Sequence, residues 1–92
     1  MNLRNSQLIN LPVFTESGQK LGRVVDFELD SQRQIIVKYY VSGQNIIKEL
    51  IGQDLLISSD QVISIDQEKM VVEDSAVEEK KRAKEKATAI PI

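Results

Sequence analysis

The sequence predicts an all-β fold: a small, partly open antiparallel β-barrel of about six short strands, followed by a charged C-terminal helix. Apolar and polar side chains alternate along residues 21–30 and 35–41, which is the period of a half-buried strand. Three further short β-rich runs follow at 54–58, 62–66 and 69–74, separated by polar connectors. The 92 residues fit one domain, and a hydrophobic fraction of 41% suffices for one aliphatic core.

The first element is the apolar run LPVF at 11–14. Pro12 cannot donate a ladder hydrogen bond, so we expect these residues to begin an edge strand. The next segment, TESGQK, is typical of a turn in which Gly18 supplies a positive φ. Gly22 is expected to allow a bulge or tight coil at a corner of the barrel. A strand rather than a helix follows these glycines, so they lack the helix N-terminus that a phosphate-binding loop requires.

The runs at 21–30 and 35–41 are expected to pair as a hairpin across the polar connector DSQRQ. Strict alternation places one set of apolar side chains inside: Leu21, Val25, Phe27, Ile35, Val37, Tyr39, Leu55 and Ile57. Arg23 shares this inner parity and is the one residue that suggests a polar pocket for a small ligand inside the barrel.

Other apolar residues must then face outward, and these form our candidate partner surface: Val24, Ile36, Tyr40, Leu56 and Val71. Cover by another part of the same chain is the alternative for any one of them. The apolar residues of IIKELIGQ, at 46–53, fit either a helical turn or a strand, and that alternative stays open.

The pattern changes after Glu73. Ser75 and Glu78 match a capping box, which predicts a helix over 76–87. We therefore expect a barrel domain at 1–73 and a charged helix or flexible tail at 74–92. The few apolar side chains of this tail predict a solvated segment rather than a docked one.

The composition excludes several classes of site. The chain has no Cys and no His, so it lacks thiolate chemistry and the commonest general base and transition-metal ligand. No catalytic serine motif is present, and we expect no catalytic residue, no metal and no cofactor. Asp26, Glu28 and Asp30 resemble the start of a calcium loop, but Val37 stands where the bidentate Glu belongs. We expect these carboxylates to lie on the outer face of a strand, where they discourage edge-to-edge pairing.

Net charge and hydropathy limit which partners and which cellular compartment we expect. The net charge of -2 gives no overall attraction for a polyanion, so we do not expect nucleic acid as a partner. No run of about 18 apolar residues occurs, and the first residues do not resemble a secretory leader. We therefore expect a cytoplasmic protein without a membrane span.

Two stretches, LINLPVFTESGQKLGRVVDFELD and DLLISSDQVISIDQEKMVVED, together resemble the PRC-barrel family. The first follows the pattern L-x-G-x-P-V, hairpin, G-x-x-L-G-x-V-x-D, and the second has an apolar D-L-L-I, then V, an acidic turn and V-V-x-E. The resemblance covers about residues 7–73. Asn10 stands where the first motif usually has glycine, and Ser58 where the late strand often has proline.

Members of this family are similar to the cytoplasmic barrel of the photosynthetic reaction centre H subunit and to the C-terminal domain of the ribosome maturation factor. The resemblance implies a partly open, six-stranded barrel that binds other proteins and has no catalytic residues to transfer. What it carries over is structural, at these positions: Pro12, Val13, Gly18, Leu21, Gly22, Val24 and Asp26. A family-like Val24 would contact a neighbouring element rather than water.

The leading functional hypothesis is therefore a non-enzymatic adaptor or scaffold that binds a protein partner, with a homodimer as one form of that contact. The alternative is a ribosome- or RNA-associated factor in which the run from Lys80 to Lys86 steers toward phosphate. A small-ligand binder that uses Arg23 is the third class.

Overall fold

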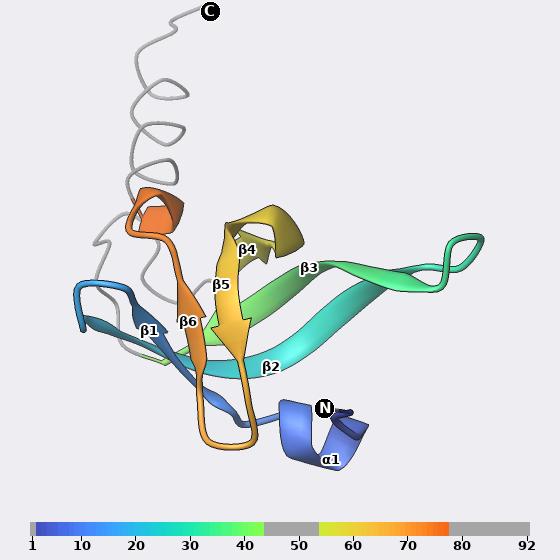
Figure 1. The fold of residues 1–92 in the computed structure, drawn as a ribbon, viewed down its shortest axis with the longest axis horizontal. Coiled ribbons are helices and arrows are strands. Elements are labelled where there is room, and N and C mark those ends of the chain that lie inside the picture. The colour runs from blue at the N-terminus through green and yellow to red at the C-terminus, as the bar shows by residue number, and fades with distance from the viewer. Residues whose placement is uncertain (1, 44–53, 78–92) are drawn as a thin grey trace, which may run out of the picture.

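The structure is a computed structural model that describes residues 2–43 and 54–77. Six strands in these ranges form one sheet in the order β4-β3-β2-β1-β6-β5 (Figure 1). The elements are α1 (Asn5–Leu8), β1 (Pro12–Thr15), β2 (Lys20–Asp30), β3 (Ile35–Ser42), β4 (Leu55–Ser58), the 3-10 helix η2 (Ser59–Gln61), β5 (Val62–Ile65) and β6 (Met70–Val72). Among the described residues the two edge strands, β4 and β5, share no ladder and are connected through η2. The predicted fold class, a small and partly open β-barrel, is confirmed.

β2 and β3 form the hairpin that the alternating pattern predicted. β1 pairs with β2 only as far as Arg23, and β4 pairs with β3 only from Lys38 onward. The last rungs of the hairpin, which end with Asp30 opposite Ile35, therefore have no third strand beside them. We call residues 29–36 the hairpin arm, and Figure 1 shows this end of the hairpin projecting from the rest of the molecule.

β1 lies in the middle of the sheet, so the prediction of an edge strand is wrong. It pairs antiparallel with β2 and parallel with β6, and the other pairings in the sheet are antiparallel. Pro12 is tolerated because it is the first residue of the strand. It lies opposite Arg23 of β2, whereas the ladder to β6 begins only at Val13, opposite Met70.

An irregularity in β2 changes which of its side chains face the core. The ladder with β3 shifts between Val24 and Asp26, so Val25 is an extra residue at that point. Val24, predicted to face outward, is fully buried, and Val25, predicted to face inward, is 37% exposed. Arg23 is exposed as well, so it does not reach the interior where we expected it. Phe27, beyond the bulge, packs against the core as predicted.

A second irregularity, between Glu28 and Leu29, changes the phase of β3 in the hairpin arm. Leu29 lies opposite Ile36, and Ile36 packs against the core although alternation placed it outside. Ile35, predicted to be internal, is 46% exposed. Strict period-2 alternation is therefore wrong at both irregularities of this hairpin.

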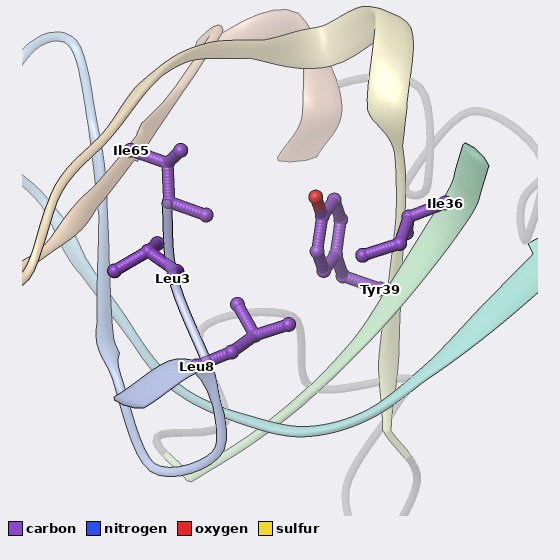
Figure 2. Close-up of a pocket in the computed structure, with 5 residues that line it drawn as sticks. All are labelled: Leu3, Leu8, Ile36, Tyr39 and Ile65. Atoms are coloured by element: carbon purple, nitrogen blue, oxygen red, sulfur yellow. The ribbon is translucent and has the colours of Figure 1, made fainter. Parts of the chain in front are cut away.

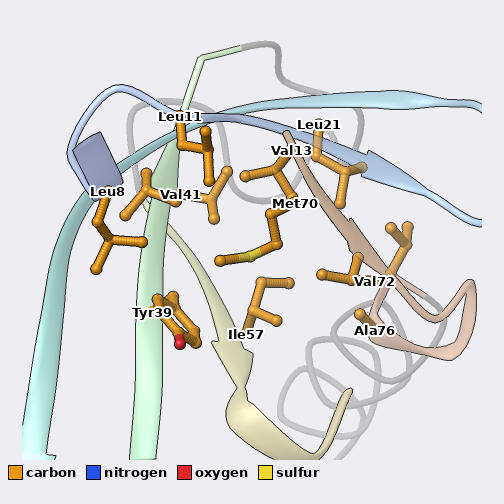
Figure 3. Close-up of a cluster of buried hydrophobic side chains, with 12 residues drawn as sticks. Leu8, Leu11, Val13, Leu21, Tyr39, Val41, Ile57, Met70, Val72 and Ala76 are labelled. Carbon is orange, nitrogen blue, oxygen red and sulfur yellow. The ribbon is translucent and has the colours of Figure 1, made fainter. Parts of the chain in front are cut away.

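The core is aliphatic, as the composition predicted, and draws on both ends of the described chain (Figure 3). Its buried members are Leu8, Leu11, Val13, Leu21, Val24, Tyr39, Val41, Ile57, Met70, Val72, Ala76 and Val77. Ala76 and Val77 follow Ser75, where a helical turn begins one residue before the predicted start. The first turn of the predicted tail is thus packed in the core rather than solvated.

Two predictions fall on residues that the structure does not describe. These are the ambiguous segment at 46–53 and the remainder of the predicted helix, which contains the run from Lys80 to Lys86.

Two glycines allow β2 and β3 to approach closely at a corner of the barrel. Gly22 has φ 141° and Gly43 has φ 146°. A Cβ on Gly22 would overlap the carbonyl oxygen of Ser42, and a Cβ on Gly43 would lie 2.8 Å from the Cα of Gly22. The ladder between β1 and β2 also shifts here, with Leu21 as the extra residue. Gly18 has φ 96° in the β1–β2 turn, but open space surrounds it.

Candidate functional site

The predicted partner surface is divided by the fold. Val24 lies in the core and Ile36 packs against it, because the two register shifts in the β2–β3 ladder change which side chains face inward. Tyr40 and Leu56 lie directly opposite each other in the β3–β4 ladder, on the outer face. Val71 lies in β6, opposite Phe14 of β1. Phe14 was not among the residues that alternation placed on the outer face. A partner role for Tyr40, Leu56 and Val71 stays a prediction.

Polar interactions surround Tyr40 on this outer face. Its hydroxyl donates a hydrogen bond to the carboxylate of Glu28, and the Nζ atom of Lys38 lies 3.7 Å from the other oxygen of that carboxylate. The hydrogen bond to Glu28 raises the pKa of Tyr40, and desolvation and the nearby negative charges of Glu28, Asp26 and Asp54 act in the same direction. Lys38 therefore offsets only part of the negative charge beside the Tyr40–Leu56 pair.

An apolar pocket of about 220 Å³ lies between β3, β5 and the N-terminal segment that carries α1. It is lined by Leu3, Leu8, Ile36, Tyr39 and Ile65. Figure 2 shows that Leu3, Leu8 and Ile65 face Ile36 and Tyr39 across the space. The side chains that line the pocket are therefore apolar except for one polar atom, the hydroxyl of Tyr39.

The Tyr39 side chain is 8% exposed, and its hydroxyl is the polar group among the side chains that line the pocket. In Figure 2 its oxygen points away from Leu8. Burial raises the pKa of Tyr39, because the phenolate would lose its hydration. The hydroxyl therefore stays protonated across the physiological range.

Backbone hydrogen bonds hold the N-terminal wall of the pocket against β2. Asn10 donates to the carbonyl oxygen of Val24 at 2.7 Å, and Val24 donates back to the carbonyl of Leu11 at 3.0 Å. Asn10 adopts φ 75°, which turns the chain sharply between α1 and β1. This turn places Leu8 both in the core and in the pocket lining.

The hairpin arm presents apolar side chains on a well-connected turn. Leu29 is 54% exposed, and Ile35, on the opposite face of the arm, is also exposed. The Asp30 carboxylate accepts hydrogen bonds from the backbone N–H groups of Gln32 and Arg33, at 3.0 Å and 3.2 Å, and from Arg33 Nε at 2.8 Å. The side-chain bond from Arg33 is the main reason that the pKa of Asp30 is lowered. The turn is therefore held by hydrogen bonds within the arm itself.

The sequence did not indicate the pocket. Leu3 and Leu8 flank or belong to a one-turn helix, which is too short for a periodic pattern, and Ile65 is distant in the chain. Arg23, the residue that suggested an internal ligand site, is exposed and does not line the pocket.

Residues 2–43 and 54–77 contain neither a cluster of metal ligands nor a membrane-spanning helix. No group of three or more His, Cys, Asp or Glu side chains in these ranges is placed to hold a metal ion. No helix in these ranges combines the length and the apolar character needed to cross a membrane.

Comparison with known proteins completes the description of the site. A family model for the PRC-barrel domain matches residues 2–79. This match spans α1, all six strands and the buried Ala76 and Val77, and so extends beyond the resemblance at 7–73 on both sides. A comparison with curated proteins found no match. The chain belongs to the PRC-barrel domain family.

Proposed function

We propose that the chain is a non-enzymatic, cytoplasmic adaptor or scaffold module that binds protein through its hairpin arm. One observation carries this proposal: the arm projects beyond its neighbouring strands, and Leu29, the first residue of the arm, is 54% exposed. A two-stranded ribbon without a third strand or a packed face is only marginally stable in water. A protein surface that covers the apolar side chains of the arm would supply the missing packing.

The order of the arm supports this use. Asp30 and Arg33 fix the turn by side-chain and backbone hydrogen bonds, and their charges neutralise each other. A preorganised tip loses little conformational entropy on association, so more of the contact energy appears as affinity. Neutralised charges also avoid the cost of burying an unpaired ion at an interface.

The proposal of a non-enzymatic role rests on the side chains that are present. The chain contains neither His nor Cys. The pocket is lined by aliphatic groups and the phenol of Tyr39, and the raised pKa of that phenol makes it a poor base or nucleophile at neutral pH.

The proposal is tested by capture of partners from an extract of the source cells with the full chain as bait. Leu29→Lys places a charge on the exposed apolar side of the arm and should abolish recovery of the specific partners. Ile63→Lys is the matched control, because Ile63 is 52% exposed but lies in β5, away from the arm. Equal recovery by the wild-type chain and both variants would contradict the proposed role of the arm.

The ribosome- or RNA-associated alternative rests on the sequence run from Lys80 to Lys86 alone. It requires RNA affinity that falls steeply with salt, and that weakens when these lysines are changed to glutamine. RNA binding that does not depend on salt, or no binding at micromolar protein, would eliminate it.

A further inference from the structure

We infer that the partner for the pocket is a second copy of this chain, with Leu29 of each hairpin arm inserted into the pocket of the other copy. This inference rests on the proposed function, since it uses the same arm as the binding element. It adds the identity of the partner and the place where Leu29 is received.

The projecting side chain and the pocket lie next to each other on one face of the molecule. Leu29 is directly opposite Ile36 in the β2–β3 ladder, so both side chains point to the same side of the ribbon. Ile36 also lines the pocket. A symmetric dimer requires that a surface be complementary to itself across a two-fold axis. A projecting group beside a receiving pocket meets this requirement, because one rotation brings both pairs together.

The chemistry of the pocket suits an apolar side chain. An apolar cavity of about 150 Å³ is enough to bind benzene, so a pocket of about 220 Å³ has room for a leucine side chain. Tyr39 supplies the one polar atom among the side chains of the lining. A peptide backbone or a carboxylate would leave most of its polar groups unpaired there, whereas a leucine side chain has none to pair.

Charge does not oppose the contact between two arms. Asp30 and Arg33 are the charged residues of the hairpin arm, and they are paired within each copy. The net charge of the chain is only -2, so long-range repulsion between copies is weak. A domain of this size also gains from association, because a single small core supplies little stability.

The first test is the molar mass of the full chain by light scattering across a concentration series. Because the mutual contact is small, we expect a dissociation constant of about 1 to 100 μM, and a mass that rises toward twice 10.4 kDa. Leu29→Lys should raise the dissociation constant at least about 100-fold, since two leucine side chains lose their burial in one dimer. Val25→Lys is the control, because Val25 is also exposed, at 37%, lies at the bulge of β2 and does not line the pocket, so it should leave the dimer intact.

The second test locates the contact by cross-linking, which the absence of native cysteine makes specific. Leu3→Cys and Leu29→Cys are prepared as separate single variants of different mass, mixed and mildly oxidised. The inference predicts a mixed disulfide between the two chains, since Leu3 lines the pocket that receives Leu29. A mixture of Leu3→Cys with Val25→Cys is the control and should not cross-link, because Val25 is exposed but lies outside the hairpin arm.

Each outcome is decisive. Melting curves of every variant show whether it is folded, and Leu29→Ala replaces Leu29→Lys if the lysine unfolds the chain. A monomer at about 1 mM protein, a dimer that survives the Leu29 substitutions, or cross-links that form equally in the control would overturn the inference. If the chain is monomeric but Leu29→Lys still loses partners captured from the extract, the adaptor role stands and only the identity of the partner is wrong.

Discussion

Asn10 shows how a single residue determines a turn. It occupies the position where the family motif usually has glycine, and its φ of 75° lies in the left-handed region that glycine and asparagine tolerate best. We predict that Asn10→Gly leaves the free energy of unfolding unchanged or slightly higher. Asn10→Ala should lower it by about 1 kcal/mol, because alanine is strained at this φ. Urea denaturation of the three proteins checks both values, and equal stability of the alanine and glycine variants would contradict this account.

Gly22 and Gly18 separate backbone strain from steric overlap. Both have a positive φ, but only Gly22 has a backbone atom where a Cβ would be placed. Gly18→Ala should therefore cost about 1 kcal/mol, from the backbone conformation alone. Gly22→Ala should cost at least about 2 kcal/mol, because β2 must also move away from Ser42. Thermal and urea unfolding measure both losses of stability. Similar losses in the two variants would show that β2 and β3 can move apart at little energetic cost.

The two tyrosines predict a loss of stability in alkaline solution. The folded-state pKa of each is raised, by burial for Tyr39 and first by the hydrogen bond to Glu28 for Tyr40. A raised pKa stabilises the fold at pH values below the unfolded value of about 10, and this stabilisation is lost as pH rises through the folded pKa. The free energy of unfolding should therefore fall above pH about 10. Tyr40→Phe should make this fall shallower, and an unchanged slope would exclude a contribution from Tyr40.

At the scale of the element, the sequence predicted the strands well and their exact phase poorly. The limits of β2 and β3 agree with the predicted runs to within one residue at each end, because alternation is a property of the whole strand. The side-chain directions were wrong at Val24, Val25 and Ile36, because two register shifts interrupt the period. Such a shift depends on the partner strand, so the sequence of one strand does not contain it.

The bulge at Val25 gives a direct test of these directions. Val24→Ala should lower the free energy of unfolding by about 2 kcal/mol, because it leaves a cavity at a fully buried position. Val25→Ala should change it by less than about 1 kcal/mol, since its side chain is partly solvated already. The two substitutions delete the same atoms at neighbouring positions, so each is the control for the other. Equal losses of unfolding free energy in urea denaturation would contradict the assignment of Val24 to the core and Val25 to the surface.

At the scale of the whole molecule, the family and the architecture were predictable, whereas the site was not. Motif order predicted the PRC-barrel family, and the family model confirms it. The pocket combines Leu8, Tyr39 and Ile65 from three distant segments, and their meeting depends on how the sheet curls. Val24 and Ile36 do not belong to the candidate surface that alternation predicted, because they face the core. The reason is the same, since neither the curvature of a sheet nor its register is a local property of the sequence.

The core continues past Glu73, where the composition changes. Ala76 is fully buried in the first turn of the C-terminal segment, while its neighbour Ser75 is only half-buried. Ala76→Asp should lower the free energy of unfolding by about 3 kcal/mol, because it buries a carboxylate without a partner. Ser75→Asn should change it by less than about 1 kcal/mol, since Ser75 is only half-buried and an amide N–H can replace the hydroxyl that donates to the Glu73 carboxylate at 2.9 Å. Equal stability of the two variants would place this turn outside the folded unit.

The parallel pairing of β1 with β6 sets a condition on synthesis. Val13 meets Met70, and Ser17 donates to Asp74, across 57 positions of the chain. Contacts of such long range form only after the intervening polypeptide has been made and brought back, which slows folding. While the ribosome is still translating the middle of the message, β1 has no β6 to join. The nascent chain must therefore wait with one side of its first strand unsatisfied until nearly all of the domain has emerged.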